Sequence, residues 1–307
     1  MLLQVSNINK AFADNELLNN CSFHIQEKEK CALVGNNGTG KTTLLKIING
    51  IIPSDAGSVS LQSGAEIGYL SQLDAVDSEN TVLEELTNAK QEIFDEEAEI
   101  AELSEKMKVL SGDELNSAMN RYAFLQHDFE LKNGYAARSE ITGVLKGLGF
   151  SEEDGNKKCD HLSGGQKTRV ALGKILLRKP DLIILDEPTN HLDISSIEWL
   201  EGFLKSYPGA VLLVSHDRYF LDRVVTRVFA LESGTIRTYE GNYSDFSMKQ
   251  KALRDARIKA WMNQQEEIKH QEEVITKLKQ FNREKSIKRA ESREKLLSKI
   301  DRLDKPV

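Results

Sequence analysis

The sequence predicts an α/β fold with a mainly parallel sheet and a helical insert, followed by an α-helical hairpin. Two observations support this prediction. Short apolar runs typical of buried strands alternate with segments of helical periodicity, and the composition changes near residue 244. Residues 245–307 hold 17 Lys and Arg against 11 Asp and Glu and contain no Gly, whereas residues 1–244 carry a formal balance of −13. An acidic globular part is therefore followed by a basic helical part.

Length and composition exclude several classes of protein. The 307 residues allow one large or two modest domains, and the longest apolar runs are far shorter than the ~18 residues that cross a bilayer. Cys21, Cys31 and Cys159 show no Cys-x-x-Cys spacing, and the first residues lack the basic and apolar regions of a secretory signal. We therefore expect a cytoplasmic protein without membrane association and without a cysteine metal site.

The N-terminal part of the chain reads as strands around one helix. Residues 2–23 are β-like, and residues 30–34 (KCALV) form a buried-strand candidate that ends at a Gly-rich turn. The pattern predicts a helix over residues 42–51 that is ended by Pro53. Residues 58–69 alternate apolar and polar side chains, which is typical of short strands.

The middle of the chain reads as a helical insert. Residues 82–135 have helical periodicity and are strongly acidic at 92–105, which predicts a charged face in solvent. Helices and strands alternate again downstream, and this alternation predicts parallel strands with helices packed on the sheet. The elements expected there are a helix over 163–178, a strand over 182–185, a helix over 194–205 and a strand over 210–215.

A Gly-rich segment between the strand at 30–34 and the next helix has the context of a phosphate-binding loop. Residues 35–42 read GNNGTGKT and fit G-x-x-x-x-G-K-[ST]. Glycines let consecutive backbone N–H groups surround a phosphate, and the helix N-terminus adds partial positive charge. Lys41 is expected to reach the β- and γ-phosphates and Thr42 to bind Mg²⁺; the alternative is a turn that binds nothing. The ATP-binding candidates in this segment are Gly35, Asn36, Asn37, Gly38, Thr39, Gly40, Lys41, Thr42 and Thr43.

Two carboxylates follow the apolar strand at 182–185. A strand buried on both faces places the next residues, Asp186 and Glu187, at its carboxyl end, where open α/β sheets bind ligands. Asp186 suits the shell of a Mg²⁺ ion, and Glu187 suits a general base for water. Taken alone, these acids read equally as a strand end in solvent.

A third motif carries a family resemblance. Residues 162–166 read LSGGQ, which resembles the signature of ATP-binding-cassette (ABC) ATPases, and they lie between the phosphate loop and the carboxylates, as in that family. The resemblance implies a P-loop NTPase fold with a helical subdomain, ATP hydrolysis, and ATP with Mg²⁺ as ligands. It also implies that a second cassette, in the parent chain or in a second copy, is needed for full activity. The signature residues that would cap the nucleotide of that second cassette are Ser163, Gly164, Gly165 and Gln166.

The same resemblance assigns roles to single residues. Phe12 resembles the aromatic residue that stacks on adenine, Gln72 the Q-loop glutamine, and His216 the switch histidine that faces the γ-phosphate. Taken alone, Phe12 reads better as a packing aromatic and His216 as a strand-end histidine, but the surrounding motifs favour the functional roles. The resemblance thus implies Glu187, His216 and Gln72 as catalytic residues and Thr42, Gln72 and Asp186 as Mg²⁺ ligands.

Two further segments resemble the ABC-F class. Residues 186–193 read DEPTNHLD, with Asn-His-Leu-Asp where transporters commonly carry a Ser-Ala-Leu-Asp-like run, and residues 239–246 (YEGNYSDF) resemble the passage from cassette to interdomain linker. We therefore expect a cassette over residues 1–244, with its helical insert and signature region at about 82–178, and a basic helical linker over residues 245–307. ABC-F proteins carry two cassettes and this sequence carries one, so we expect the N-terminal half of a longer protein.

The basic segment reads as two helices paired antiparallel, with a bend near residues 282–286. Positive charge concentrates at this bend, which forms the tip of the hairpin. The apolar stripes expected to face each other are Val274, Leu278 and Phe281, and Leu296, Ile300 and Leu303. The candidate RNA-contact residues are Arg283, Lys285, Lys288, Arg289 and Arg293.

By composition alone the tip reads as a solvated hairpin or as a surface for nucleic-acid phosphates. The ABC-F resemblance favours the second, because the linker of that family enters the ribosome and approaches tRNA and ribosomal RNA. We therefore expect an ATPase that couples nucleotide state to ribosome binding, in antibiotic resistance or in general translation. The alternatives are the ATPase subunit of a membrane ABC transporter and a non-catalytic DNA-repair or structural cassette. An intact Glu187 and phosphate loop argue against the last.

Overall fold

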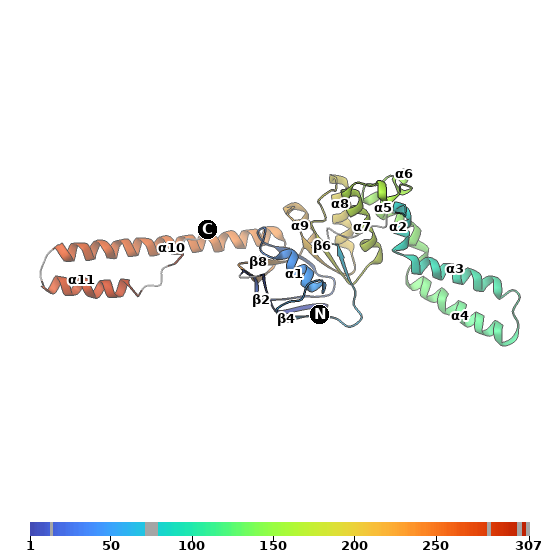
Figure 1. The fold of residues 1–307 in the computed structure, drawn as a ribbon, viewed down its shortest axis with the longest axis horizontal. Coiled ribbons are helices and arrows are strands. Elements are labelled where there is room, and N and C mark those ends of the chain that lie inside the picture. The colour runs from blue at the N-terminus through green and yellow to red at the C-terminus, as the bar shows by residue number, and fades with distance from the viewer. Residues whose placement is uncertain (13–14, 71–78, 281–283, 300–302, 305–307) are drawn as a thin grey trace. The chain divides into compact units, whose positions relative to one another are not determined.

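The structure is a computed structural model that describes residues 1–12, 15–70, 79–280, 284–299 and 303–304 (Figure 1). Its contacts divide the chain into two compact units, Met1–Tyr243 and Ser244–Val307. The first unit combines two sheets with a group of helices, and the second consists of paired helices. None of the helices in the described part of the chain has the combined length and apolar character of a membrane-spanning segment.

A six-stranded sheet forms the centre of the first unit. Its strands are β3 (Lys30–Val34), β5 (Ile67–Leu70), β6 (Leu182–Asp186), β7 (Ala210–Val214), β8 (Arg227–Glu232) and β9 (Thr235–Glu240). Their order is β5-β6-β7-β3-β8-β9, and only the β8–β9 pair among them is antiparallel. Strands β6 and β7 are apolar almost throughout because both of their faces are buried. The predicted α/β fold with a mainly parallel sheet is confirmed.

A second sheet holds three antiparallel strands in the order β2-β1-β4, with β1 at Leu3–Phe12, β2 at Asn15–Ile25 and β4 at Ala56–Leu61. Residues 58–69, predicted as short strands, are therefore divided between the two sheets as β4 and β5. Gly57 lies where β1 is irregular: its φ is 88°, and a Cβ there would lie 2.4 Å from the carbonyl oxygen of Asn7. Only glycine allows the two strands to approach so closely.

Helix α1 (Lys41–Ile48) follows β3 and packs Leu44 and Leu45 into a core that contains residues of both sheets. The predicted end at residue 51 is wrong, because the helix stops three residues earlier and not at Pro53. Gly50 adopts a φ of 69°, and its N–H donates to the carbonyl oxygen of Ile47 at 3.0 Å. A glycine in this left-handed conformation is a common helix stop, and it acts here before the proline is reached.

Helices fill the segment between β5 and β6. They are α2 (Val82–Asn88), α3 (Gln91–Lys106), α4 (Gly112–Leu131), α5 (Ala137–Gly147), α6 (Glu152–Gly155) and α7 (Gly164–Arg178), with short 3-10 turns at Gly134–Ala136 and Cys159–His161. The helical insert expected over 82–135 is present, but breaks at residues 89–90 and 107–111 divide it into three helices. Downstream, α8 (Ile194–Ser206) and α9 (Arg218–Val224) begin at the side-chain caps of Asp193 and Asp217.

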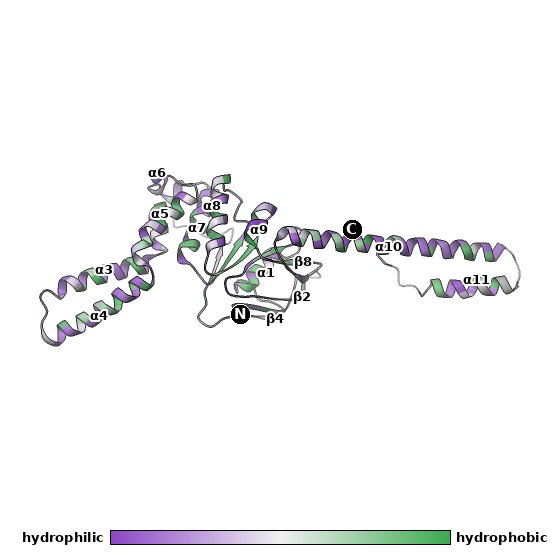
Figure 2. Ribbon diagram, turned by 180° about the vertical axis from the view of Figure 1, so that it is seen from behind, coloured by the Kyte–Doolittle hydropathy of each residue, from purple (hydrophilic) through white to green (hydrophobic). Residues whose placement is uncertain are grey.

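Helices α3 and α4 lie side by side as a hairpin, and hydrophilic and hydrophobic residues alternate along both helices (Figure 2). Glu99 of α3 pairs with Arg121 of α4 at 2.9 Å, and Glu97 pairs with Arg138 at the start of α5 at 2.8 Å. The acidic segment at 92–105 was expected to face only solvent. It also joins α3 to the following helices, because their basic side chains lie opposite its carboxylates.

Ion pairs also join α7 to the helices before it. The Glu85 side chain on α2 is only 2% exposed and contacts the Nζ of Lys174 on α7. Glu140 on α5 pairs with Lys90 at 2.8 Å and with Lys179, directly after α7, at 2.6 Å. These charges fix the position of α7 within the helical part.

The second unit is a hairpin of α10 (Tyr243–Gln280) and α11 (Glu284–Leu297). Lys279 Nζ lies 2.6 Å from Glu294 Oε1, and Arg293 Nη1 donates to Gln271 Oε1 at 2.7 Å, so the helices run antiparallel as expected. The predicted bend at 282–286 is too long, because α11 already begins at Glu284.

The face along which α10 and α11 meet differs from the predicted stripes. Leu296 is 65% exposed, so its expected place in the contact is wrong, whereas Ile268, Ile275 and Ala290 are buried. Leu303 is 47% exposed, but its N–H donates to Gln264 Oε1 of α10 at 2.7 Å. Phe281 and Ile300 lie outside the described residues, and Val274 is half-buried. Buried and half-buried positions recur along the two helices at the three- and four-residue intervals of a coiled coil, and we call this set of positions the seam. It consists of Trp261, Gln264, Ile268, Gln271, Ile275 and Leu278 on α10 and of Ile287, Ala290, Glu294 and Leu297 on α11.

Candidate functional site

The predicted phosphate loop connects β3 to α1, and its conformation depends on glycine. Gly38 and Gly40 have φ values of 80° and 102°, in the left-handed region that favours glycine. A Cβ at Gly40 would lie 2.9 Å from Leu17 of β2, and one at Gly35 would lie 2.6 Å from the carbonyl oxygen of Leu231. Larger side chains at these positions would therefore collide with β2 and β8. The other candidates in the loop, Asn36, Asn37 and Thr39, are exposed or half-exposed.

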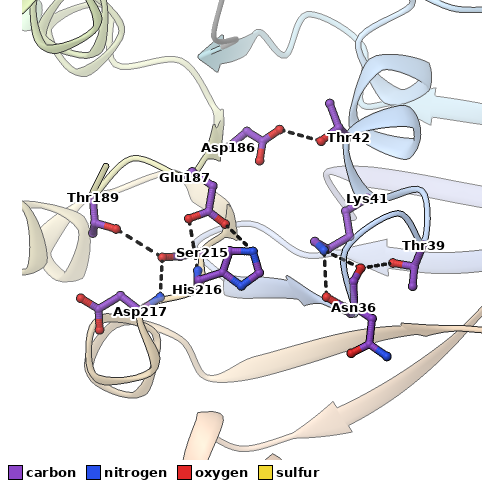
Figure 3. A network of polar contacts seen from close by, with 11 residues as sticks. Asn36, Thr39, Lys41, Thr42, Asp186, Glu187, Thr189, Ser215, His216 and Asp217 are labelled. Atoms are coloured by element: carbon purple, nitrogen blue, oxygen red, sulfur yellow. Dashed lines mark hydrogen bonds and ion pairs between the residues drawn. The ribbon is translucent and has the colours of Figure 1, made fainter. Parts of the chain in front are cut away.

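Lys41 folds back over the loop. Its Nζ donates to the carbonyl oxygens of Gly35 and Asn36 at 2.8 and 3.0 Å, and the Thr39 hydroxyl donates to the same Asn36 oxygen at 2.9 Å (Figure 3). Burial lowers the pKa of Lys41, and the nearby carboxylates of Glu187 and Asp186 partly oppose this shift. An anion held by the loop would offer this ammonium a stronger acceptor than two carbonyl oxygens.

Thr42 and Asp186 meet across the space between α1 and β6. The Thr42 hydroxyl donates to Asp186 Oδ2 at 3.0 Å (Figure 3), and Thr43 lies half-buried beside it in the first turn of α1. Among the described residues, no group of three or more His, Cys, Asp or Glu side chains is able to hold a metal ion. A hydroxyl and a carboxylate fit a Mg²⁺ ion that takes its other ligands from water and phosphate. Gln72, the third predicted ligand, lies outside the described residues.

Glu187 is held firmly at the end of β6. Its φ is 55°, and its N–H donates to the carbonyl oxygen of Val214 at 2.8 Å. Its side chain is 13% exposed; Oε2 accepts the backbone N–H of His216 at 3.2 Å, and Oε1 lies 3.7 Å from His216 Nε2 (Figure 3). Burial raises the pKa of Glu187, although the His216 N–H partly opposes the shift.

The Oε1 atom of Glu187 is available to accept a proton. Oε1 is buried and accepts no hydrogen bond from any described residue. A carboxylate with an unsatisfied oxygen and a raised pKa is suited to take a proton from water. The same oxygen faces His216, a side chain that the family resemblance places beside the γ-phosphate.

The sequence analysis gives no role to two hydroxyl groups that follow the same strands as Glu187 and His216. Ser215 is buried at the end of β7; its Oγ lies 3.4 Å from Thr189 Oγ1 and accepts the Asp217 N–H at 3.1 Å (Figure 3). These contacts join the segments that follow β6 and β7. The signal that identifies them is their position just beyond the carboxyl ends of two buried parallel strands, one residue after β7 for Ser215 and three residues after β6 for Thr189.

The signature segment forms the N-terminus of α7. Ser163 Oγ accepts the Gln166 N–H at 3.3 Å, and Gln166 Oε1 accepts the Ser163 N–H at 3.0 Å, which together form a capping box. The N–H groups of Gly164 and Gly165 lie in the first turn, where a helix offers them no acceptor. A Cβ at Gly165 would lie 3.0 Å from His191, whose φ is 95°. The signature therefore packs against the segment that follows β6.

Phe12 ends β1 and is 50% exposed. It pairs with Asn15 in the β1–β2 hairpin, and Leu17 of the same hairpin contacts the phosphate loop at Gly40. The predicted adenine-stacking residue thus lies on a hairpin that borders the loop. The predicted residues that the structure brings together around the loop are Lys41, Thr42, Asp186, Glu187 and His216.

The RNA-contact candidates lie in the second unit. Lys288 is exposed on α11, and Arg293 donates to Gln271. Lys285 and Arg289 lie on α11, and Arg283 lies outside the described residues.

Family models match most of the chain. One described as ABC transporter matches residues 18–190, more than half of the chain, and an extension model with the same description matches residues 229–307. The chain is 42% identical to the Bacillus subtilis protein YdiF, over 100% of this chain and 48% of YdiF. It is 37% identical to ABC transporter F family member 5 of Arabidopsis thaliana, over 90% of this chain and 40% of the relative.

A third relative is the energy-dependent translational throttle protein EttA of Mycobacterium tuberculosis, 35% identical over 78% of this chain and 42% of EttA. The chain thus spans about half the length of these relatives or less. Among solved structures, an ATP-binding subunit of an ABC transporter matches with a TM-score of 0.58 and 21% identity, over 78% of this chain and 90% of that one.

A second solved structure is a dimeric ATP-binding cassette in a post-hydrolysis state, bound to ADP and Pi. It matches with a TM-score of 0.53 and 23% identity, over 78% of this chain and 98% of that one. Both structures share the fold of the first unit, and the family model spans the phosphate loop and both carboxylates. This chain belongs to the ABC transporter family and carries one of its ATP-binding cassettes.

Proposed function

We propose that this chain is one ATPase half of a cytoplasmic ABC-F protein that hydrolyses MgATP and passes its nucleotide state to the ribosome. The observation that carries the ATPase proposal is the meeting of Lys41, Thr42, Asp186 and Glu187 around one glycine-dependent loop. A loop of backbone donors, an ammonium, a Mg²⁺-binding pair and a buried carboxylate are the groups that phosphoryl transfer to water requires.

Each residue then has a distinct role. The N–H groups of residues 35–43 and the Lys41 ammonium hold the phosphates, while Thr42, Asp186 and Gln72 hold Mg²⁺. Glu187 takes the proton of the attacking water, and His216, which lies within 3.7 Å of it, stabilises charge on the transferred group. Phe12 stacks on the adenine ring. Mg²⁺ neutralises the phosphate charge that develops during transfer.

We also propose that the signature acts on the nucleotide of a second cassette. The N–H groups of Gly164 and Gly165, at the start of a 15-residue helix, form an anion site whose ligand must come from elsewhere. The second cassette belongs to the parent chain or to another copy, and the dimeric structural relative supports such an arrangement.

Complementation between two variants tests whether one ATP site is formed by the phosphate loop of one cassette and the signature of another. We expect neither Lys41→Ala, with a damaged phosphate loop, nor Ser163→Glu, with a damaged signature, to turn over ATP. A mixture of the two contains one intact loop facing one intact signature, so we expect it to regain turnover. The activity per chain of the unaltered protein should also rise with its concentration. Turnover that is fast, independent of concentration and unaffected by Ser163→Glu would contradict the proposal.

The ribosome proposal rests on the second unit and on the relatives. The sequence around the bend of the hairpin is rich in Lys and Arg, its segment matches the extension model, and two relatives are named as an F family member and as a translational throttle protein. A basic helical tip offers contacts to RNA phosphates without reading bases, so binding should weaken as salt is raised.

Charge reversal tests the tip. We expect Lys285→Glu, Lys288→Glu and Arg289→Glu together to reduce co-sedimentation with ribosomes and to flatten its dependence on salt. A matched control reverses three basic residues far from the tip, Lys251, Arg254 and Lys259, and should leave most of the association intact. Equal loss in both triple variants would show a response to net charge only and would remove the assignment to the tip.

A second candidate is the ATPase subunit of a membrane transporter. The description of the family model and the structural relative favour it. Co-sedimentation separates the two candidates, because the first requires association with ribosomes and the second with membranes that contain a transporter partner.

A further inference from the structure

A charged contact lies against the ring of Phe12. Lys10, two residues earlier on β1, places its Nζ over the ring, 5.6 Å from the ring centre. The same Nζ donates to Asp55 Oδ1 at 2.7 Å, and the Lys10 side chain is only 12% exposed. The ammonium therefore lies between an aromatic face and a carboxylate.

Asp55 also holds the backbone of β1. Its Oδ2 accepts the Ala11 N–H at 2.8 Å, and its own N–H donates to the carbonyl oxygen of Asn9 at 2.9 Å. The register of β1 is shifted on both sides here, between Ser6 and Asn9 against β4 and between Lys10 and Ala11 against β2. Asp55 thus replaces regular strand pairing at the point where β1 leads into Phe12.

The orientation of the Phe12 ring affects base stacking because Phe12 lies on the hairpin that borders the phosphate loop. The residue is half-exposed, and the Lys10 ammonium lies over one face of its ring, so a base would stack on the opposite face. Leu17 of the same hairpin contacts Gly40, so a nucleotide held by the loop would extend its base along this border. A flat base stacks best on an aromatic ring that is held in one orientation.

We propose that Lys10 and Asp55, which we call the ring clamp, are positioning residues for the nucleobase: they fix Phe12 by a cation on its rear face and leave its front face for stacking. Neither residue touches the phosphates in this arrangement. The inference rests on the proposed ATP site, and it adds two residues to it that lie outside all of its motifs.

Binding of two ligands, one with a nucleobase and one without, tests the ring clamp. We expect Asp55→Asn and Lys10→Met each to weaken MgATP binding about three- to tenfold, the range for partial loss of one stacking contact. Binding of magnesium tripolyphosphate, which has no base, should not change. Calorimetry on the 307-residue chain measures both affinities, and Glu152→Gln, which removes an exposed ion pair with Lys146, is the control.

A double-mutant cycle separates positioning from support of the fold. If the ring clamp acts through Phe12, Asp55→Asn should have no further effect on ATP affinity in a Phe12→Ala background. Equal weakening of ATP and tripolyphosphate, unchanged ATP affinity, or additive effects in the cycle would each overturn the inference while leaving the phosphate site intact. A chain that binds neither ligand would instead overturn the proposed function, and the inference with it.

Discussion

Glu187→Gln is expected to slow ATP turnover by about 100- to 10,000-fold while MgATP still binds, the range for loss of a positioned general base. The amide keeps the size of the side chain and an oxygen for the His216 N–H, but it is unable to take a proton from water. Single-turnover phosphate release and calorimetry, at a protein concentration that gives maximal turnover, measure the two quantities. The control is Glu198→Gln on an exposed position of α8. An unchanged rate would remove Glu187 as the base.

The pH dependence of turnover gives the same residue a second test. A base must be deprotonated to act, and burial raises the pKa of Glu187 above its ordinary value. Activity should therefore fall, as pH is lowered, at a higher pH than an exposed glutamate would give. This acidic limb should be absent from the residual activity of Glu187→Gln.

Lys174→Met is expected to lower the free energy of unfolding by about 3 kcal/mol, the scale for a buried charge that loses its partner. The substitution leaves the Glu85 carboxylate, 2% exposed, with the Asn80 amide at 2.9 Å but without its cation. Chemical denaturation followed by Trp199 fluorescence measures the effect, because the indole packs directly on Gly147 of α5. A Trp261→Phe background removes the other tryptophan.

Two controls separate the buried charge from other effects. Replacing both partners, Glu85→Leu with Lys174→Met, should recover much of the lost stability because no unpaired charge remains. Lys146→Met breaks an exposed ion pair and should cost no more than about 0.5 kcal/mol. If Lys174→Met costs no more than this control, the buried pair does not stabilise the helical part.

Local signals explain why so much of the fold was predictable. Residues 30–34 and 182–185 are short apolar runs beside glycine or carboxylates, and such runs have little freedom except as buried strands. The end of α1 was mispredicted because Pro53 is the more obvious stop, whereas Gly50 ends the helix through a backbone conformation that the sequence only permits. The predicted apolar stripes differ from the seam because Gln264, Gln271 and Glu294 interrupt its apolar pattern.

The candidate site also contains residues that local motifs predict and residues that only the fold brings together. The loop and its carboxylates each lie in a short contiguous motif, so their residues could be named from the sequence alone. Ser215 and Thr189 meet only because the order β6-β7-β3 brings the ends of distant strands together. The ring clamp depends on an irregular strand and on Asp55, which directly precedes another strand, and no spacing rule connects Lys10 to a residue 45 positions away.

The amide and carboxylate groups within the seam restrict the lengths that this hairpin is able to adopt. Hydrogen bonds such as Arg293 to Gln271 specify one alignment of the two helices, which apolar contacts alone would leave free to slide. Growth or shortening by one heptad in each helix preserves that alignment and keeps the tip facing the same way. Insertion or deletion of any other number of residues rotates the tip about the hairpin axis. The length of the hairpin is therefore adjustable in increments of one heptad, or about two helical turns.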